Sequence, residues 1–206
     1  MTDAPLLRID GPDDAAATLL LAHGAGAGMD HEWMQTVATG IAARGVRVVR
    51  FEFPYMAARR EGRRPGPDRL PKLQDAFGEV FRSLSGTVAI GGKSMGGRVA
   101  TTVADELGAA CVVVFGYPFH PPGKPETLRT EHLRELRTAT LILQGERDTF
   151  GTREEIGGYE LSDAIDVQFL DDGDHSLKPR KKSGFTHEQH LQTAIERAAA
   201  FVRRHA

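Results

Sequence analysis

The sequence predicts a doubly wound α/β fold, in which one domain over residues 1–206 is built on a mostly parallel sheet. Apolar, β-branched runs alternate along the chain with segments whose apolar residues recur at helical spacing, and this alternation is typical of strand–helix–strand units. Several of the runs are apolar throughout, as expected of strands that helices cover on both faces. No internal repeat and no long linker divides the chain, so we expect a single domain.

In the first half of the chain, glycine and proline mark the ends of the expected elements. Gly45 ends the first helix, and Pro54 stops the strand that follows it. Residues 59–71 are rich in Arg, Pro and Gly and predict an exposed loop. The elements expected here are strands at 6–9, 18–22, 46–51 and 87–90, and helices at about 32–44 and 73–84.

The second half continues the alternation and closes with an amphipathic helix. Val99, Val103 and Leu107 lie four residues apart and predict the buried stripe of a helix that Gly108 ends. Residues 116–125 hold too many prolines for regular structure and predict a loop or a pocket wall. The elements expected after this helix are strands at 111–115, 139–144 and 165–170, a short helix at about 126–137, a helix near 153–159, and a last helix at 186–203 with Thr186 as its N-cap.

The composition excludes several classes of protein. With 40% hydrophobic and 26% charged residues, the chain is ordinary for a globular domain, and its formal net charge of -2 offers no general attraction to nucleic acid or to an anionic membrane. No apolar run approaches the roughly 18 residues that span a bilayer, and the N-terminus lacks a signal-peptide pattern. We therefore expect a cytoplasmic monomer or homodimer. The one cysteine, Cys111, lies in an apolar run and is expected in the core.

Residues 87–98 form the segment around which the chemistry is organised. An apolar run breaks into glycines around Ser94, and Gly92 and Gly96 complete a G-x-S-x-G pattern. In such a pattern, the strand-to-helix turn is so tight that side chains at the flanking positions would collide. A serine becomes a nucleophile when a base removes its proton at an exposed turn. The pattern alone does not identify a nucleophile. A chain with 23 glycines can match it by chance, and Ser94 could instead cap a helix.

Two further residues lie at strand ends in the order that a serine hydrolase requires. Sites in open α/β sheets form outside the carboxyl ends of the strands, and the acid and then the base follow the serine. Asp148 follows the strand at 139–144, and His175 follows the strand at 165–170. Asp171, Asp172 or Asp174 could orient the base instead, and His120 could compete with His175, whereas the histidines on the expected helices are assigned to solvent.

Four strings carry a resemblance to the α/β-hydrolase superfamily, namely His23-Gly24, Gly92 to Gly96, Gly145 to Asp148, and Gly173 to His175. More narrowly, the residues at 92–98, 116–125 and 174–179 resemble the small, lidless, dienelactone-hydrolase-like group that includes the NSL-complex-subunit and testis-expressed α/β-hydrolase-like proteins. This resemblance implies Ser94 as nucleophile, His175 as general base and Asp148 as the residue that holds the imidazole.

The remaining parts of the expected site are an oxyanion hole and a pocket. The backbone N–H of Met95, at the start of the nucleophile helix, is one expected donor, and the N–H of Ala25, or else of Gly26, is the other. His23 is expected to support this loop. The roles of Lys93 and of the basic cluster at 178–182 stay open. The residues that could line an acyl pocket, each of which could equally belong to the core, are Gly26, Trp33, Met34, Tyr55, Met56, Tyr117, Phe119 and His120.

Competing motifs fit less well. Gly92-Lys93-Ser94 resembles the end of a phosphate-binding loop, but Thr87 stands where that motif needs its first glycine. The glycines at 24 and 26 imitate a dinucleotide-binding pattern whose third glycine is replaced by Met29, and no His/Cys cluster has metal-ligand spacing. We therefore expect a serine hydrolase, without cofactor or metal, acting on a small carboxylic ester, lactone or thioester in an open pocket without a cap domain. The rival hypothesis is a protein-interaction module with little or no turnover.

Overall fold

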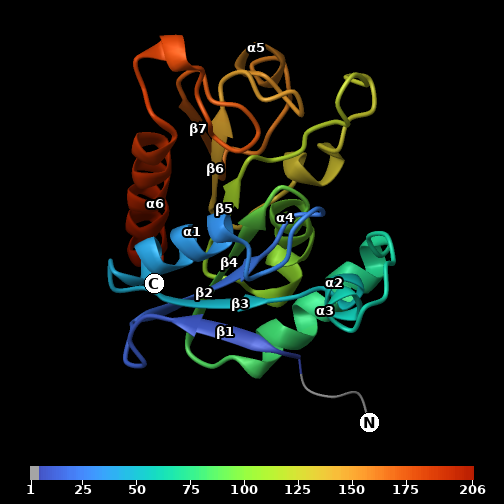
Figure 1. The fold of residues 1–206 in the computed structure, drawn as a ribbon, viewed down its shortest axis with the longest axis vertical. Coiled ribbons are helices and arrows are strands. Elements are labelled where there is room, and N and C mark those ends of the chain that lie inside the picture. The colour runs from blue at the N-terminus through green and yellow to red at the C-terminus, as the bar shows by residue number, and fades with distance from the viewer. Residues whose placement is uncertain (1–4) are drawn as a thin grey trace.

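The computed structural model describes residues 5–206, whose seven strands form one sheet in the order β1-β3-β2-β4-β5-β6-β7 (Figure 1). Only the β1–β3 pair is antiparallel, so the mostly parallel sheet is confirmed. The strands are β1 (Leu7–Asp10), β2 (Ala17–Ala22), β3 (Arg47–Phe51), β4 (Thr87–Lys93), β5 (Val112–Phe115), β6 (Thr140–Gly145) and β7 (Ile165–Leu170).

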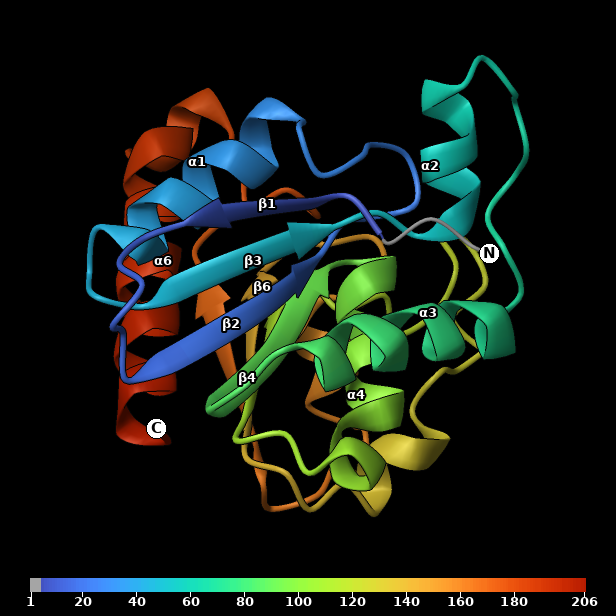
Figure 2. The same cartoon turned by 90° about the horizontal axis from the view of Figure 1, so that it is seen from below.

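Helices cover both faces of the sheet. Figure 2 shows α1 (Glu32–Ala42) and α6 (His187–Arg204) on one side, and α3 (Leu70–Ser83) and α4 (Met95–Leu107) on the other. Thr186 caps α6 in a capping box, and Gly108 ends α4 in the left-handed conformation, as expected. No helix among residues 5–206 has the length and apolar character needed to cross a membrane.

Two hydrophobic cores lie on opposite faces of the sheet, because successive side chains of a strand point to opposite sides. In β2, Leu20 packs with α2, α3 and α4, whereas its neighbours Leu19 and Leu21 pack with α1 and α6. Every residue of β2, β5 and β6 is buried, which explains why these strands read as continuous apolar runs. Cys111 is also buried, as expected.

One helix was missed, and one expected helix is only a 3₁₀ turn. Pro54 begins the helix α2 (Pro54–Arg60) instead of only ending β3, because proline fits the first turn of a helix, where its missing N–H costs no hydrogen bond. The expected helix at 126–137 is one 3₁₀ turn (Glu131–Arg134), since the Asp105 carboxylate accepts the N–H groups of Arg137 and Thr138 and so holds the segment extended.

The helix expected near 153–159 is the single turn α5 (Arg153–Ile156), and a second 3₁₀ turn spans Lys181–Ser183. The connection between β5 and β6 is therefore a loop with one 3₁₀ turn. Within the described part of the chain, no cap domain stands over the carboxyl ends of the strands.

Candidate active site

Ser94 lies on the sharp turn between β4 and α4, with φ 50° and ψ -114°. A residue with a side chain rarely adopts this backbone region, and such strained positions cluster at functional sites. The two flanking glycines are required by the same turn. A Cβ atom on Gly92 would lie 2.5 Å from the carbonyl carbon of Gly96, and one on Gly96 would lie 2.5 Å from the carbonyl oxygen of His23.

The structure brings Ser94, His175 and Asp148 together from three loops that follow β4, β7 and β6. His175 Nε2 lies 2.8 Å from Ser94 Oγ, and His175 Nδ1 lies 2.7 Å from Asp148 Oδ2. Because the buried carboxylate accepts at Nδ1, the imidazole carries its proton there and leaves Nε2 free to accept the serine hydroxyl. These are the positions of a nucleophile, a base and an orienting acid.

Asp148 is held in place by two further donors. The backbone N–H of Phe150 donates to Oδ1 at 2.9 Å, and Gln144 Nε2 donates to Oδ2 at the same distance. Gln144 is buried at the end of β6 and also binds both backbone groups of Tyr117. Sequence reasoning missed it, although a glutamine in an otherwise largely apolar strand was a signal.

The competing acids and base lie elsewhere. Asp172 pairs with Arg180, and Asp174 accepts the N–H groups of Ser176 and Lys178 within its own turn. Asp171 lies 3.8 Å from Arg153, and His120 is buried with its Nδ1 beside its own neighbour's carbonyl, Pro121 O. None of these groups contacts the His175 ring in the residues that the structure describes.

Burial lowers the pKa of His175, and the positive charge of Lys93 lowers it further, while the hydrogen bond to Asp148 acts in the opposite direction. The imidazole is therefore neutral, and able to accept a proton, from below pH 6.5 upward. The ring of Phe150 stacks on the imidazole with 4.1 Å between centroids and 29° between planes. This aromatic cover shields the His175–Asp148 pair from water.

Two buried side chains, those of His23 and Tyr55, hold the glycine-rich loop after β2 by hydrogen bonds to its backbone carbonyls. His23 Nδ1 donates to Gly24 O at 2.7 Å, because its other nitrogen accepts the N–H of Phe53 at 3.1 Å. Tyr55 Oη donates to Ala25 O at 3.0 Å. Since the N–H and C=O of a trans peptide point in opposite directions, the Ala25 N–H is directed away from His23 and toward the open side of the loop.

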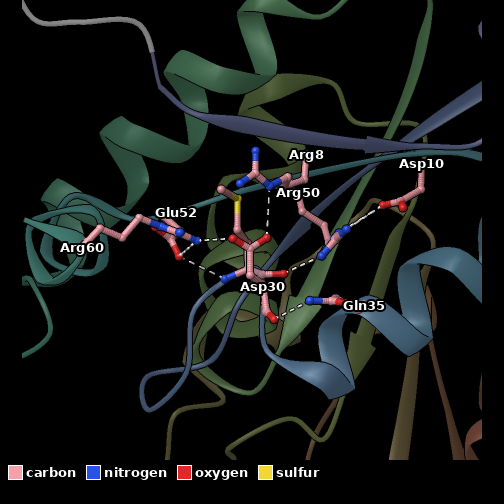
Figure 3. A network of polar contacts seen from close by, with 8 residues as sticks. Arg8, Asp10, Asp30, Gln35, Arg50, Glu52 and Arg60 are labelled. Atoms are coloured by element: carbon pink, nitrogen blue, oxygen red, sulfur yellow. Dashed lines mark hydrogen bonds and ion pairs between the residues drawn. The ribbon is translucent and has the colours of Figure 1, made fainter.

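A network of charged groups anchors the far end of this loop (Figure 3). Glu52 Oε1 accepts the N–H of Met29 at 3.3 Å, and Arg50 Nη1 donates to Met29 O at 2.6 Å. Arg60 binds both the Glu52 and the Asp30 carboxylates, and these two anions raise its pKa. The loop is thereby tied to β3 and α2. The outer members of the network are Arg8, Asp10 and Gln35.

A cleft of about 580 Å³ opens over Ser94 and His175. Of the predicted lining residues, Gly26, Trp33 and Met34 border it, and so does Ala25, the expected oxyanion donor. Its other walls come from the loop after β2, the first turns of α1 and α6, and the loops that carry His175 and Asp148. These other lining residues are Gly24, Ala27, His31, Glu32, Thr36, Lys93, Phe150, Ser176, His187 and Leu191.

The pocket prediction was wrong for Tyr55, Met56, Tyr117, Phe119 and His120, which do not border the cleft. All five are buried, because α2 and the loop after β5 fold over the sheet face that α3 and α4 cover. Tyr117 Oη donates to Arg129 O at 2.8 Å, and Phe119 packs against Tyr117 with 4.7 Å between ring centroids.

Two histidines of α6 also differ from their predicted solvent-facing role. His187 borders the cleft and contacts Ser176 O through Nε2 at 3.0 Å, and His190 is buried against Leu177 O. The helix turns this face inward because its apolar stripe packs on α1. Among residues 5–206, no group of three His, Cys, Asp or Glu side chains is arranged to hold a metal ion.

Comparisons with known proteins agree with this architecture. A family model described as alpha/beta hydrolase domain matches residues 15–203. An esterase domain from Rhodothermus marinus superposes with a TM-score of 0.68 at 18% identity, covering 96% of this chain and 92% of that one. A lidless α/β serine hydrolase from Xanthomonas campestris gives 0.64 at 17% identity, over 97% and 86% of the two chains.

A dienelactone hydrolase from Anabaena variabilis gives a TM-score of 0.70 at 17% identity, covering 96% of this chain and 90% of that chain. At these identities the likeness concerns the fold. No curated protein matches the sequence.

Proposed function

Because this chain belongs to the alpha/beta hydrolase domain family, whose model spans residues 15–203, we propose that it is a serine hydrolase that cleaves a small carboxylic ester, lactone or thioester through an acyl-enzyme. One observation carries the proposal: an unbroken hydrogen-bonded line from Ser94 Oγ through the His175 ring to the buried Asp148 carboxylate. A helix-capping role for Ser94 is not supported, since its side chain makes no capping hydrogen bond to α4.

In the proposed reaction, His175 Nε2 accepts the hydroxyl proton as Ser94 Oγ attacks the substrate carbonyl carbon. Asp148 stabilises the imidazolium that forms, and proton transfer of this kind contributes roughly 10²–10⁴-fold to the rate. His175 then returns the proton to the leaving group. A water, activated by the same imidazole, attacks the acyl-serine and releases the carboxylic acid.

The oxyanion of the tetrahedral intermediate is proposed to bind the backbone N–H groups of Met95 and Ala25. Met95 is the first residue of α4, so its N–H has no acceptor within the helix and lies at the positive end of the helix dipole. The Ala25 N–H is supported by His23 and Tyr55, which hold the carbonyls of the same loop on its opposite side. Losing one such donor typically costs about 10²–10³ in turnover.

The cleft favours small substrates with an apolar part. Trp33, Met34, Phe150 and Leu191 supply apolar surface, and its volume of about 580 Å³ fits a small molecule. The absence of a cap within the described residues leaves the cleft open at the top. The narrower kinship with the NSL-complex-subunit and testis-expressed α/β-hydrolase-like proteins also belongs to this proposal, and the strings at 92–98, 116–125 and 174–179 support it.

Labelling with a fluorophosphonate probe tests the nucleophile, and release of p-nitrophenol from short-chain esters tests turnover. We expect wild type and Ser85→Ala, a change at an exposed serine, to be labelled equally. Ser94→Ala should lose labelling and His175→Ala should lose most of it. If wild type is labelled no better than Ser94→Ala, the hydrolase proposal fails, and the protein-interaction module becomes the better hypothesis.

A further inference from the structure

Lys93 is the residue immediately before the nucleophile, at the end of β4, and its side chain crosses the site. The proposed mechanism assigns it no role. Its Cγ atom lies beside Gly24 of the oxyanion loop, where a Cβ on that glycine would be 3.6 Å away. From there the side chain runs toward the base, and its Nζ atom donates a hydrogen bond to the backbone carbonyl of His175.

The same ammonium group lies over the ring of Trp33, 5.7 Å from the ring centroid. Lys93 thus contacts three separate parts of the site: the oxyanion loop after β2, the loop that carries the base, and the first turn of α1. The loop after β2 and α1 are neighbours in the sequence, whereas His175 lies 82 residues after Lys93. A cation over an indole face and a charged donor on a carbonyl are both favourable contacts when partly removed from water.

Gly116, at the end of the neighbouring strand β5, leaves the space that this arrangement needs. A Cβ atom there would lie 3.1 Å from Lys93 Nζ and 2.8 Å from His175 O. Its φ of 68° is also in the region that favours glycine. The contact between Lys93 and the base loop is therefore accommodated by the local backbone and is not a chance approach of a surface lysine.

The charge of Lys93 acts on the base. Burial lowers the pKa of Lys93 to about 8, and the carboxylates of Asp148 and Asp174 oppose that shift. Within residues 5–206, Lys93 forms no ion pair, and the carboxylates that act on its charge are those of Asp148 and Asp174. Three other titratable side chains border the cleft. His31 lies just before α1, Glu32 is the first residue of α1, and His187 is the first residue of α6.

We infer that Lys93 is a positioning residue, which fixes the loop of the proposed base His175 relative to Ser94 and keeps the imidazole in its neutral, proton-accepting form. The inference rests on the proposed function for its catalytic consequence. The positioning of the His175 loop does not depend on turnover, because Lys93 contacts this loop and acts on the imidazole in the resting protein.

The test compares Lys93→Met, which removes both charge and donor, Lys93→Gln, which keeps a neutral donor, and Lys93→Arg, which keeps the charge. Lys124→Met, at an exposed position outside the cleft, is the control. The pKa of the His175 imidazole is read by NMR titration. We expect it to rise by about 0.5–1 unit in Lys93→Met and Lys93→Gln, and to stay within about 0.2 unit of wild type in Lys93→Arg and Lys124→Met.

On an ester substrate, Lys93→Met should lose about 10-fold or more in kcat while KM changes less than about twofold, because small displacements of a catalytic group are costly to turnover. Lys93→Arg should recover activity to within about threefold of wild type. An unchanged His175 pKa in Lys93→Met would overturn the inference, as would equal kcat in Lys93→Met and Lys124→Met when the wild type is active.

These readouts separate the two proposals. If wild type turns over no ester but the His175 pKa still responds to Lys93→Met, the positioning role stands and the hydrolase proposal fails. If wild type is active and no Lys93 variant changes either the pKa or kcat, the hydrolase proposal stands and the positioning role is wrong. Should Lys93→Met fail to fold in thermal denaturation, Lys93→Gln and Lys93→Arg give the same comparison.

Discussion

The charged network under the oxyanion loop makes a quantitative prediction for Glu52→Gln. The Glu52 side chain is 5% exposed, accepts two N–H groups of Arg60, and also accepts the N–H of Met29. Glutamine keeps one oxygen and places an NH₂ group where the second oxygen was. A donor then faces the Arg60 guanidinium or the Met29 N–H, so one buried donor loses its acceptor.

The size of the effect follows from the number and burial of these bonds. A hydrogen bond to a charged group contributes about 1.5–3 kcal/mol, and the lower end applies here because the Arg60 side chain is 39% exposed and screened by water. Together with the weakened bond to the Met29 N–H, we expect a loss of about 2–3 kcal/mol in the free energy of unfolding. For a chain of this length that lowers Tm by about 4–12 °C.

Urea unfolding followed by circular dichroism measures this loss, with Glu61→Gln as the matched control. Glu61 pairs with Arg63 where both side chains are about two-thirds exposed, so its removal should cost about 0–0.5 kcal/mol. We also expect Glu52→Gln to lower kcat, since the network holds the end of the loop that carries the Ala25 N–H. Equal stability of the two variants would refute the reasoning.

Four further predictions concern the site and its supports. Asp148→Asn should lower kcat by about 10³–10⁴-fold with p-nitrophenyl esters, because the amide favours the wrong imidazole tautomer, and an unchanged rate would contradict the triad. In a pH–rate profile, kcat/KM should rise through an apparent pKa below 6.5, because burial lowers the pKa of His175, and a midpoint above 6.5 would count against that cause. Burial likewise lowers the pKa of His23, so the unfolded chain binds the proton more readily than the folded one. The stability contributed by the neutral His23 is complete above about pH 6.5 and is lost as the pH falls below it. Urea unfolding midpoints at pH 5 and 7.5 would show this loss. Gly96→Ala would place a Cβ 2.5 Å from a backbone oxygen and should cost more than about 2 kcal/mol and abolish probe labelling, whereas Gly66→Ala, with no atom within 4 Å, should do neither.

The succession of strands along the chain and the three residues that follow strand ends could be predicted from the sequence, because both depend on local patterns. The order of the strands within the sheet was not predicted. Fully apolar runs indicate strands covered on both faces, and the parallel connections bring the carboxyl ends of β4, β6 and β7 to one edge of the sheet. Ser94, Asp148 and His175 follow those ends, so they converge whatever the details of the loops. The glycine spacing around Ser94 likewise indicates a tight strand-to-helix turn, which is a constraint on the backbone of only a few residues.

Only the tertiary structure decided which residues form the walls of the cleft and which support it. The loop at 116–130 could fold over either face of the sheet, and its contacts with α3 and α4 placed Tyr117 and Phe119 in the core. Phe150 and Lys93 both contact His175, which lies 25 and 82 residues away in the chain, and His187 contacts Ser176, 11 residues before it. The sequence does not distinguish an aromatic residue that lines a pocket from one buried in the core, or a lysine that holds two loops together from one that faces solvent. Long-range packing decides between these roles.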